Sequence, residues 1–142
     1  MSRAAIEGAI PHRPPFLFID EVVTQDDKRL VARKTWREDE WFYTGHYPFF
    51  PLTPGVLLCE SAMQAGAILI SGLSDAKVGG VPVAARMNDV RFKRMVRPGE
   101  TTEIEVELTD RLKDAYYLTA KVTCDNKLAA RLDFVCMLNS MQ

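Results

Sequence analysis

Glu60 and Gln64 are polar side chains in a stretch, Val56 to Ile70, that is otherwise almost entirely apolar and predicts a buried helix. Because they are spaced i and i+4, both lie on one face of that helix, one turn from each other. Burying a carboxyl group is unfavourable unless it is paired or protonated. Glu60 is therefore either an acid that donates a proton or a salt-bridged structural residue near a subunit surface.

The start of this helix is a second feature that could do chemistry. Pro54 suits the first helical position, and Thr53 is the expected N-cap. The backbone N–H groups of Gly55 and Val56 then lie at the positive end of the helix dipole, where they can bind a carbonyl oxygen that becomes an oxyanion. The alternative is an ordinary capped helix, in which Thr53 accepts one of those hydrogen bonds.

His46 lies in the loop, Gly45 to Pro54, that leads into the helix. A histidine can act as a base near neutral pH, although a loop histidine is more often a surface or hydrogen-bonded residue. His12 is open to the same interpretations, and we expect it to lack a nearby acid.

Together these groups describe one reaction. A base removes the proton α to a carbonyl, the helix start binds the enolate-like oxygen, and a protonated acid gives its proton to a departing β-hydroxyl group. With His46 as the base and Glu60 as the acid, this is elimination of water from a 3-hydroxyacyl group, or its reverse. Cys59 is a poor alternative nucleophile, because a thiol on a buried apolar helix is expected to be inert.

The elements that must position these residues are one helix and several strands. We expect the helix to end at Gly72, and a linker that contains Gly79 and Gly80 to follow it. Phe16 to Val23 is an apolar strand candidate, and after a turn at Gln25 to Lys28 a second strand returns over Leu30 to Trp36. Three further strands alternate apolar and polar residues: Glu103 to Leu108, Leu118 to Cys124 and Leu128 to Leu138. Asp125-Asn126 is the expected hairpin turn between the last two. The pattern predicts an α+β fold in which about six antiparallel strands wrap the helix.

Length and composition restrict the class of protein. We expect residues 1–142 to form a single domain, and 47% hydrophobic residues are enough for a core without staples. With 18 basic and 19 acidic residues, the chain lacks the basic excess of nucleic-acid-binding proteins. We expect neither a signal peptide nor a membrane span, because the longest apolar stretch is short and interrupted. The expected location is the cytoplasm.

The cysteines and histidines favour neither disulfides nor metal binding. Cys59, Cys124 and Cys136 are odd in number and widely spaced, unlike a disulfide framework or a set of zinc ligands. The chain has two histidines, too few for a histidine-rich metal site.

Three blocks of the sequence closely resemble the signature of the β-hydroxyacyl-acyl carrier protein dehydratases of bacterial fatty acid synthesis. The first is Pro11 to Leu17 (PHRPPFL). The second is Gly45 to Pro48 (GHYP), then Pro51, then Pro54 to Ala65 (PGVLLCESAMQA). The third is Arg91 to Arg94 (RFKR) with Pro98-Gly99. The separation of His46 from Glu60 also matches, and the likeness extends over roughly Ile10 to Cys136. Several ordered blocks are more specific than any one of them.

The resemblance implies a hot-dog fold, in which two subunits pair and each site is shared between them. His46 would come from one subunit and Glu60 from the other, often with three dimers forming a hexamer. His46 would take the α-proton, and Glu60 would bind and protonate the hydroxyl, directly or through water. The Gly55 N–H would hold the thioester carbonyl, and Gln64 would help to orient Glu60. No cofactor or metal is implied.

Such enzymes receive the acyl chain on the phosphopantetheine arm of an acidic acyl carrier protein. Basic residues that could dock it are concentrated in one part of the sequence; they are Arg86, Arg91, Lys93, Arg94 and Arg97. The same residues could equally form a solvated strand edge, because exposed charges usually contribute little.

The sequence departs from the family pattern around the expected substrate rather than at the catalytic positions. Phe49-Phe50 replace a usual Gly and a basic residue, which makes the mouth of the site bulkier and less basic. Pro82-Val83-Ala84 stand where aromatic residues commonly line the acyl tunnel, and Met95 replaces a usual proline.

A hot-dog thioesterase and a non-catalytic acyl-binding subunit are the rival functions.

Overall fold

The computed structural model describes residues 1–73 and 80–140. Its helices are α1 (Arg3–Ala9), the 3-10 helix η1 (Trp41–Thr44) and α2 (Gly55–Ser71). Its strands are β1 (Glu21–Gln25), β2 (Arg29–Thr35), β3 (Gly80–Phe92), β4 (Thr101–Leu112), β5 (Ala115–Cys124) and β6 (Lys127–Ser140).

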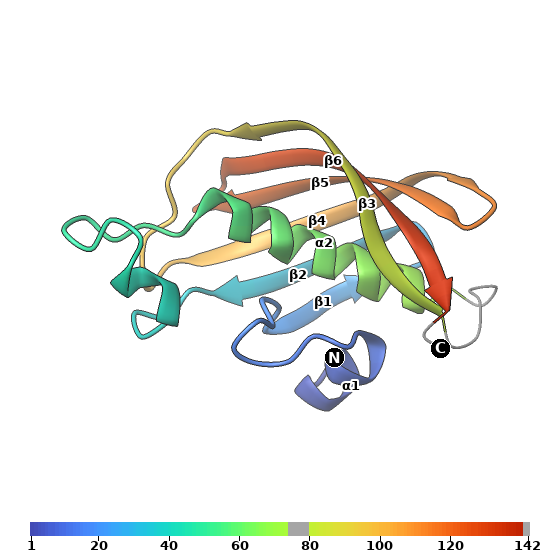
Figure 1. Cartoon of the computed structure of the whole chain (residues 1–142), viewed down its shortest axis with the longest axis horizontal. Coiled ribbons are helices and arrows are strands. Elements are labelled where there is room, and N and C mark those ends of the chain that lie inside the picture. Colours follow the sequence, from blue (N-terminus) through green and yellow to red (C-terminus); the bar gives the residue numbers. More distant parts are fainter. Residues whose placement is uncertain (74–79, 141–142) are drawn as a thin grey trace.

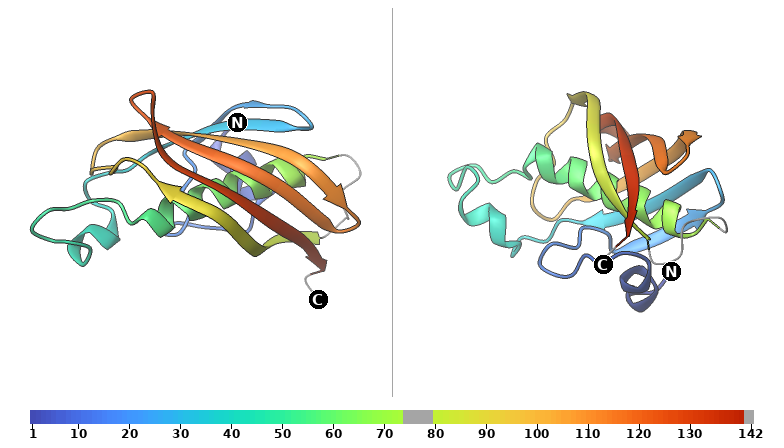
Figure 2. Two further views of the ribbon diagram at one scale, coloured as in Figure 1. Left: turned by 90° about the horizontal axis from the view of Figure 1, so that it is seen from above. Right: turned by 45° about the vertical axis from the view of Figure 1, so that its right-hand side comes forward.

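The strands form one antiparallel sheet of six strands in the order β1-β2-β4-β5-β6-β3. Helix α2 lies along one face of this sheet and contacts strands β2 to β6 (Figure 1). Two further views show the sheet curving around the helix (Figure 2). The predicted α+β arrangement, with a long helix wrapped by about six antiparallel strands, is confirmed.

Helix α2 is buried on most of its surface, as its nearly uniform apolar sequence predicts. Gly72 forms its C-cap, in agreement with the sequence. Close packing on the sheet also requires Gly66, because a Cβ atom there would lie 2.8 Å from the ring of Phe134. The helix therefore has a fixed depth and rotation, which fixes where its polar side chains point.

The alternating patterns predict β4, β5 and β6 correctly. Their inward residues include Ile104, Leu118 and Leu132, which are buried in the core. Asp125 and Asn126 have φ values of 52° and 62°, the backbone that a two-residue type I′ hairpin requires. The predicted hairpin between β5 and β6 is therefore confirmed, as is the turn between β1 and β2.

The expected strand from Phe16 to Val23 is wrong in its first half, since β1 begins only at Glu21. The backbone of Phe18 bonds to the helix instead of to a neighbouring strand. Its N–H donates to Oε1 of Gln64 at 2.7 Å, and its carbonyl accepts from Oγ of Ser61 at 2.8 Å. Apolar periodicity could not reveal this, because the segment is buried without joining the sheet.

Strand β3 has no counterpart among the expected strands. It occupies an edge of the sheet, where Pro82 is tolerated because no second strand needs its N–H. Val83 and Met87 are each 47% exposed and Phe92 is 53% exposed, so the strand shows little alternation of burial. Of the expected glycine linker, Gly80 begins β3, and Gly79 lies outside the described residues.

Over residues 1–73 and 80–140, no helix has both the length and the apolar character that crossing a membrane requires.

Candidate active site

The loop before α2 holds His46 in a defined orientation. Its imidazole Nδ1 lies 2.9 Å from the backbone carbonyl oxygen of Leu52. Because a carbonyl oxygen only accepts hydrogen bonds, the neutral ring carries its proton on Nδ1. Nε2 is then unprotonated and can act as a base. The ring is partly buried and packs edge-on against Tyr47, with 4.8 Å between ring centroids.

His46 and the N-terminus of α2 line the same cavity, of about 730 Å³, whose wall also includes Phe92. The N–H groups of Gly55 and Val56 have no acceptor among the residues that the structure describes. A Cβ atom on Gly55 would lie 2.7 Å from the Phe92 ring, so the glycine lets that ring lie close to the start of the helix. The cavity therefore combines a base with two free backbone donors.

The predicted N-cap at Thr53 is wrong. Pro54 occupies the N-cap position, and no side chain caps the helix. The hydroxyl of Thr53 instead bonds to the hydroxyl of Tyr43 at 2.6 Å. Burial raises the pKa of Tyr43 to about 12, so its hydroxyl stays protonated. The bond between Thr53 and Tyr43 rules out the ordinary capped helix, so the N–H groups of Gly55 and Val56 stay available.

Glu60 and Gln64 lie together on α2, as their spacing predicts. Gln64 is 1% exposed, and its Nε2 donates to Oε2 of Glu60 at 3.1 Å. The sequence led us to expect a fully buried Glu60, but its side chain is 22% exposed. It faces a second cavity, of about 330 Å³, that is lined with residues such as Met63, Val83 and Cys136.

Gln64 also joins the helix to the segment before β1, so its loss should affect stability. Its Oε1 accepts from the N–H of Phe18 at 2.7 Å, and its Nε2 donates to the carbonyl of Phe16 at 3.0 Å. Gln64→Leu leaves both backbone groups without a partner and should lower the free energy of unfolding by about 2–4 kcal/mol. Urea denaturation at equal protein concentration measures this, with Met63→Leu as the control. A loss no larger than the control's contradicts the role.

The contact between His12 and Glu60 is one that the sequence did not reveal. Nε2 of His12 lies 3.6 Å from Oε2 of Glu60, so the expectation that His12 lacks a nearby acid is wrong. The two are far apart in sequence and meet because the segment after α1 is hydrogen-bonded to α2 through Phe16 and Phe18. No local pattern around His12 indicates this contact.

In the part of the chain that the structure describes, His46 and Glu60 line different cavities. The His46 cavity includes Phe92, at the end of β3, and the Glu60 cavity includes Val81 to Ala84, near its start. The candidate acid and base therefore lie toward opposite ends of the same edge strand.

Cys59 is buried, and burial raises the pKa of its thiol. A protonated, inaccessible thiol is a poor nucleophile, as the sequence predicts. Cys59→Ala should therefore leave kcat within about twofold of the wild-type value. Steady-state kinetics below the unfolding range of the variant measure this. A decrease as large as that caused by loss of His46 would reinstate the thiol as a catalytic group.

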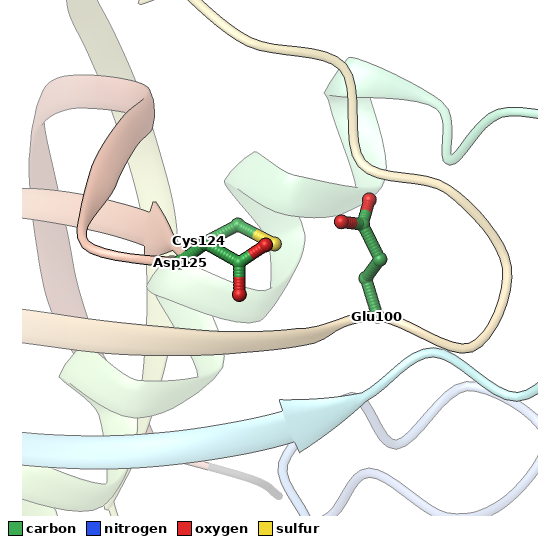
Figure 3. Close-up of side chains that lie close together, drawn as sticks. All are labelled: Glu100, Cys124 and Asp125. Carbon is green, nitrogen blue, oxygen red and sulfur yellow. The ribbon is translucent and has the colours of Figure 1, made fainter.

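Glu100, Cys124 and Asp125 form a cluster of metal-ligand type (Figure 3), with ligand atoms within 4.8 Å of one another. The guanidinium of Arg94 lies 3.0 Å from Glu100 and 3.3 Å from Asp125. The hydrogen bond from Arg94 lowers the pKa of Glu100, and burial raises the pKa of Cys124. The cluster is therefore an ion-pair network whose cation is an arginine.

The basic residues of the expected carrier-docking region do not form one patch. Arg91 pairs with Asp89 at 2.9 Å, and Arg94 belongs to the network just described. Lys93 and Arg94 also line the His46 cavity, while the Arg97 guanidinium lies 4.8 Å from the centroid of the Phe50 ring. A docking role for the whole set therefore stays a prediction.

Comparisons with known proteins identify the family. A model of the FabA-like domain matches residues 10–133. The 3-hydroxyacyl-[acyl-carrier-protein] dehydratase FabZ of Clostridium perfringens is 39% identical over 124 residues, which are 87% of this chain and 88% of the relative. The protein of the same name from Staphylococcus carnosus is 41% identical, over 87% and 86% of the two chains.

Solved structures show the same fold. The dehydratase heterocomplex ApeI:P from Xenorhabdus doucetiae superposes with a TM-score of 0.76 at 14% identity, over 95% of this chain and 91% of that one. The PaaI protein from the phenylacetic acid degradation operon of Escherichia coli gives a TM-score of 0.66 at 17% identity, over 82% and 81% of the chains. At these identities the likeness establishes the hot-dog fold alone. The sequence comparisons go further: the chain belongs to the FabA-like family.

Proposed function

We propose that this protein is a hydro-lyase that converts a 3-hydroxyacyl thioester into the trans-2-enoyl thioester in fatty acid synthesis. The observation that carries the proposal is the chemistry of the first cavity, where His46 and the free N–H groups of Gly55 and Val56 meet. A base beside an oxyanion site suits removal of a proton α to a carbonyl. The names of the FabZ relatives point to the same reaction.

In the proposed mechanism, Nε2 of His46 takes the α-proton while the thioester oxygen binds at the helix N-terminus. The electron pair of the broken C–H bond forms the double bond, and the bond from the β-carbon to the hydroxyl breaks. Glu60 gives its proton to that hydroxyl, which leaves as water. Gln64 holds the Glu60 carboxyl in place. These groups supply acid, base and oxyanion donors, and we expect no cofactor.

The proposed site is completed by a second copy of the chain. Strand β3 is an edge strand, which offers unpaired backbone groups to another strand. In a two-fold dimer the two β3 strands run antiparallel, so the Phe92 end of one lies against the Val81 end of the other. The His46 cavity of one copy then adjoins the Glu60 cavity of its partner. We propose a homodimer with two shared sites, and a hexamer of three dimers is the larger assembly that the family suggests.

We propose that an acyl carrier protein delivers the substrate on its phosphopantetheine arm, as the names of the relatives indicate for them. Lys93 and Arg94 at the first cavity are the basic groups that could meet an acidic carrier. Phe49 is 86% exposed and Phe50 is 41% exposed. The Phe49 ring lies 6.2 Å, between centroids, from the ring of Tyr47, which lines this cavity. We expect the rings of Phe49 and Phe50 to contact the carrier or the arm rather than the reacting atoms.

The single-domain organisation and the cytoplasmic location remain predictions.

One assay separates the proposed function from its rivals. The protein is incubated with 3-hydroxyacyl thioesters of acyl carrier protein and of coenzyme A, and enoyl absorbance and free thiol are followed together. Enoyl formation without thiol release supports the dehydratase. Thiol release indicates a thioesterase, and neither signal, together with saturable acyl binding, indicates a binding subunit. The ratio of kcat/KM for the two thioesters identifies the carrier.

A further inference from the structure

We propose that His12 is a positioning residue for Glu60: its neutral imidazole faces Oε2 as a donor and leaves Oε1 to carry the reactive proton. The proposal rests on the proposed function, because it takes Glu60 to be the acid. Three observations support it: the fixed amide of Gln64, the geometry of the His12 ring, and the groups that surround that ring.

The amide of Gln64 identifies Oε2 of Glu60 as an acceptor. The N–H of Phe18 can only donate, and the carbonyl of Phe16 can only accept. Their contacts with Gln64, at 2.7 Å and 3.0 Å, therefore fix which amide atom is oxygen and which is nitrogen. The nitrogen faces Oε2 of Glu60 at 3.1 Å. An oxygen that already accepts this bond is the poorer place for the acidic proton, so the proton belongs on Oε1.

The ring of His12 approaches the same oxygen from another element. Its Nε2 lies 3.6 Å from Oε2, which is beyond hydrogen-bonding distance but within reach of a small closure. Polar contacts in unliganded active sites are often long and shorten when the substrate binds. Nδ1 of His12 is buried and, among the described residues, has no hydrogen-bond partner. Among the described residues Nδ1 has no partner in either neutral tautomer, whereas a proton on Nε2 faces the Glu60 carboxyl, so the neutral ring carries its proton on Nε2.

The surroundings of His12 keep it neutral. Burial lowers its pKa below the usual value, the Glu60 carboxylate raises it, and Arg13 lowers it further. Among the described residues that line this cavity, Cys136 is the remaining titratable group; burial raises the pKa of its thiol to about 12, so it carries no charge. A neutral donor orients the Glu60 carboxyl without placing a full positive charge beside it. A charged imidazolium would hold Glu60 as a carboxylate and prevent it from giving a proton.

The backbone around His12 is held without help from the imidazole. The guanidinium of Arg13 donates to the carbonyls of Glu7, Ile10 and His12 at 2.7–2.9 Å. Substitution of the His12 ring should therefore leave this segment in place, which makes the side chain testable on its own.

The kinetic test compares two replacements of His12. In His12→Gln, a neutral N–H donor remains at about the position of Nε2, whereas His12→Leu removes it. We expect His12→Leu to lower kcat by about 10- to 100-fold with little change in KM, because Glu60 is misplaced in the transition state. His12→Gln should recover kcat to within about threefold of wild type. Near-normal kcat in His12→Leu, or equal losses in both folded variants, overturns the proposal.

A second test needs no activity, so it separates this proposal from the function on which it rests. The chain has two histidines, and labelling them with ¹⁵N gives two imidazole patterns that the variants assign. We expect His12 at neutral pH to be the uncharged tautomer with its proton on Nε2. The ring of His46 serves as the internal control. An Nδ1–H tautomer, or an imidazolium at neutral pH, overturns the proposal even if the enzyme dehydrates its substrate.

Discussion

His46→Ala and Glu60→Gln should each lower kcat for enoyl formation by about 10²- to 10⁴-fold, the contribution of a positioned acid or base. Alanine removes the Nε2 lone pair that takes the α-proton. Glutamine keeps the size of Glu60 and can still accept the hydrogen bond from Gln64, but it has no acidic proton to give. Steady-state and single-turnover measurements of enoyl absorbance, with the same 3-hydroxyacyl thioester, determine both effects.

These losses count as catalytic only if the variants fold and bind substrate. Both residues are partly exposed at cavity walls, so their unfolding midpoints should stay close to that of the wild type. Substrate affinity, measured in the inactive variants, should change much less than kcat. If either variant turns over at a near-normal rate, the corresponding role is wrong.

Chains that carry these two substitutions should restore activity when they are combined. In a shared site, the Glu60→Gln chain supplies an intact His46 and the His46→Ala chain supplies an intact Glu60. Half of randomly formed dimers are mixed, and each mixed dimer has one intact site of two, so about a quarter of wild-type activity should return. Co-expression with two different tags, followed by tandem purification, isolates the mixed dimers, which should show about half of wild-type activity.

The matched control combines His46→Ala with a chain that carries both substitutions. No intact His46 is present in any of its dimers, so activity should stay at the level of the single variants. Mixed dimers of the first pair that are as inactive as this control would show that acid and base act within one chain. A protein that remains monomeric at assay concentration would contradict the shared site in the same way.

The sequence predicts α2 and its polar face because burial and helical period depend on residues near one another in the chain. Glu60 and Gln64 follow from that period alone. The failures have another origin: Thr53 bonds to Tyr43, Phe18 bonds to Gln64, and His12 meets Glu60, all through tertiary contacts. Local patterns cannot contain such partners, so the helix cap, the start of β1 and the contact of His12 with Glu60 were not predictable from them.

The edge strand β3 shows a further limit of the sequence pattern. Its residues neither alternate in burial nor form a continuous apolar run, because one side of the strand is open in the single chain. His46 and Glu60 lie on different cavities of one chain, although the family resemblance pairs them. In the proposed dimer, what the sequence pattern lacks is the position of the second subunit, which no local propensity encodes.

The place of β3 in the sheet also affects how the protein is made. This strand leaves the ribosome before β4, β5 and β6, yet among the described residues its strand partner is β6, with Gly80 opposite Ser140 and Phe92 opposite Ala130. Pairings between such distant segments form late in folding, and an unpaired strand is prone to wrong associations meanwhile. Both cavities take part of their wall from β3. A nascent chain that lacks β6 should therefore have neither half of the site, and catalytic competence should arise only after that strand emerges.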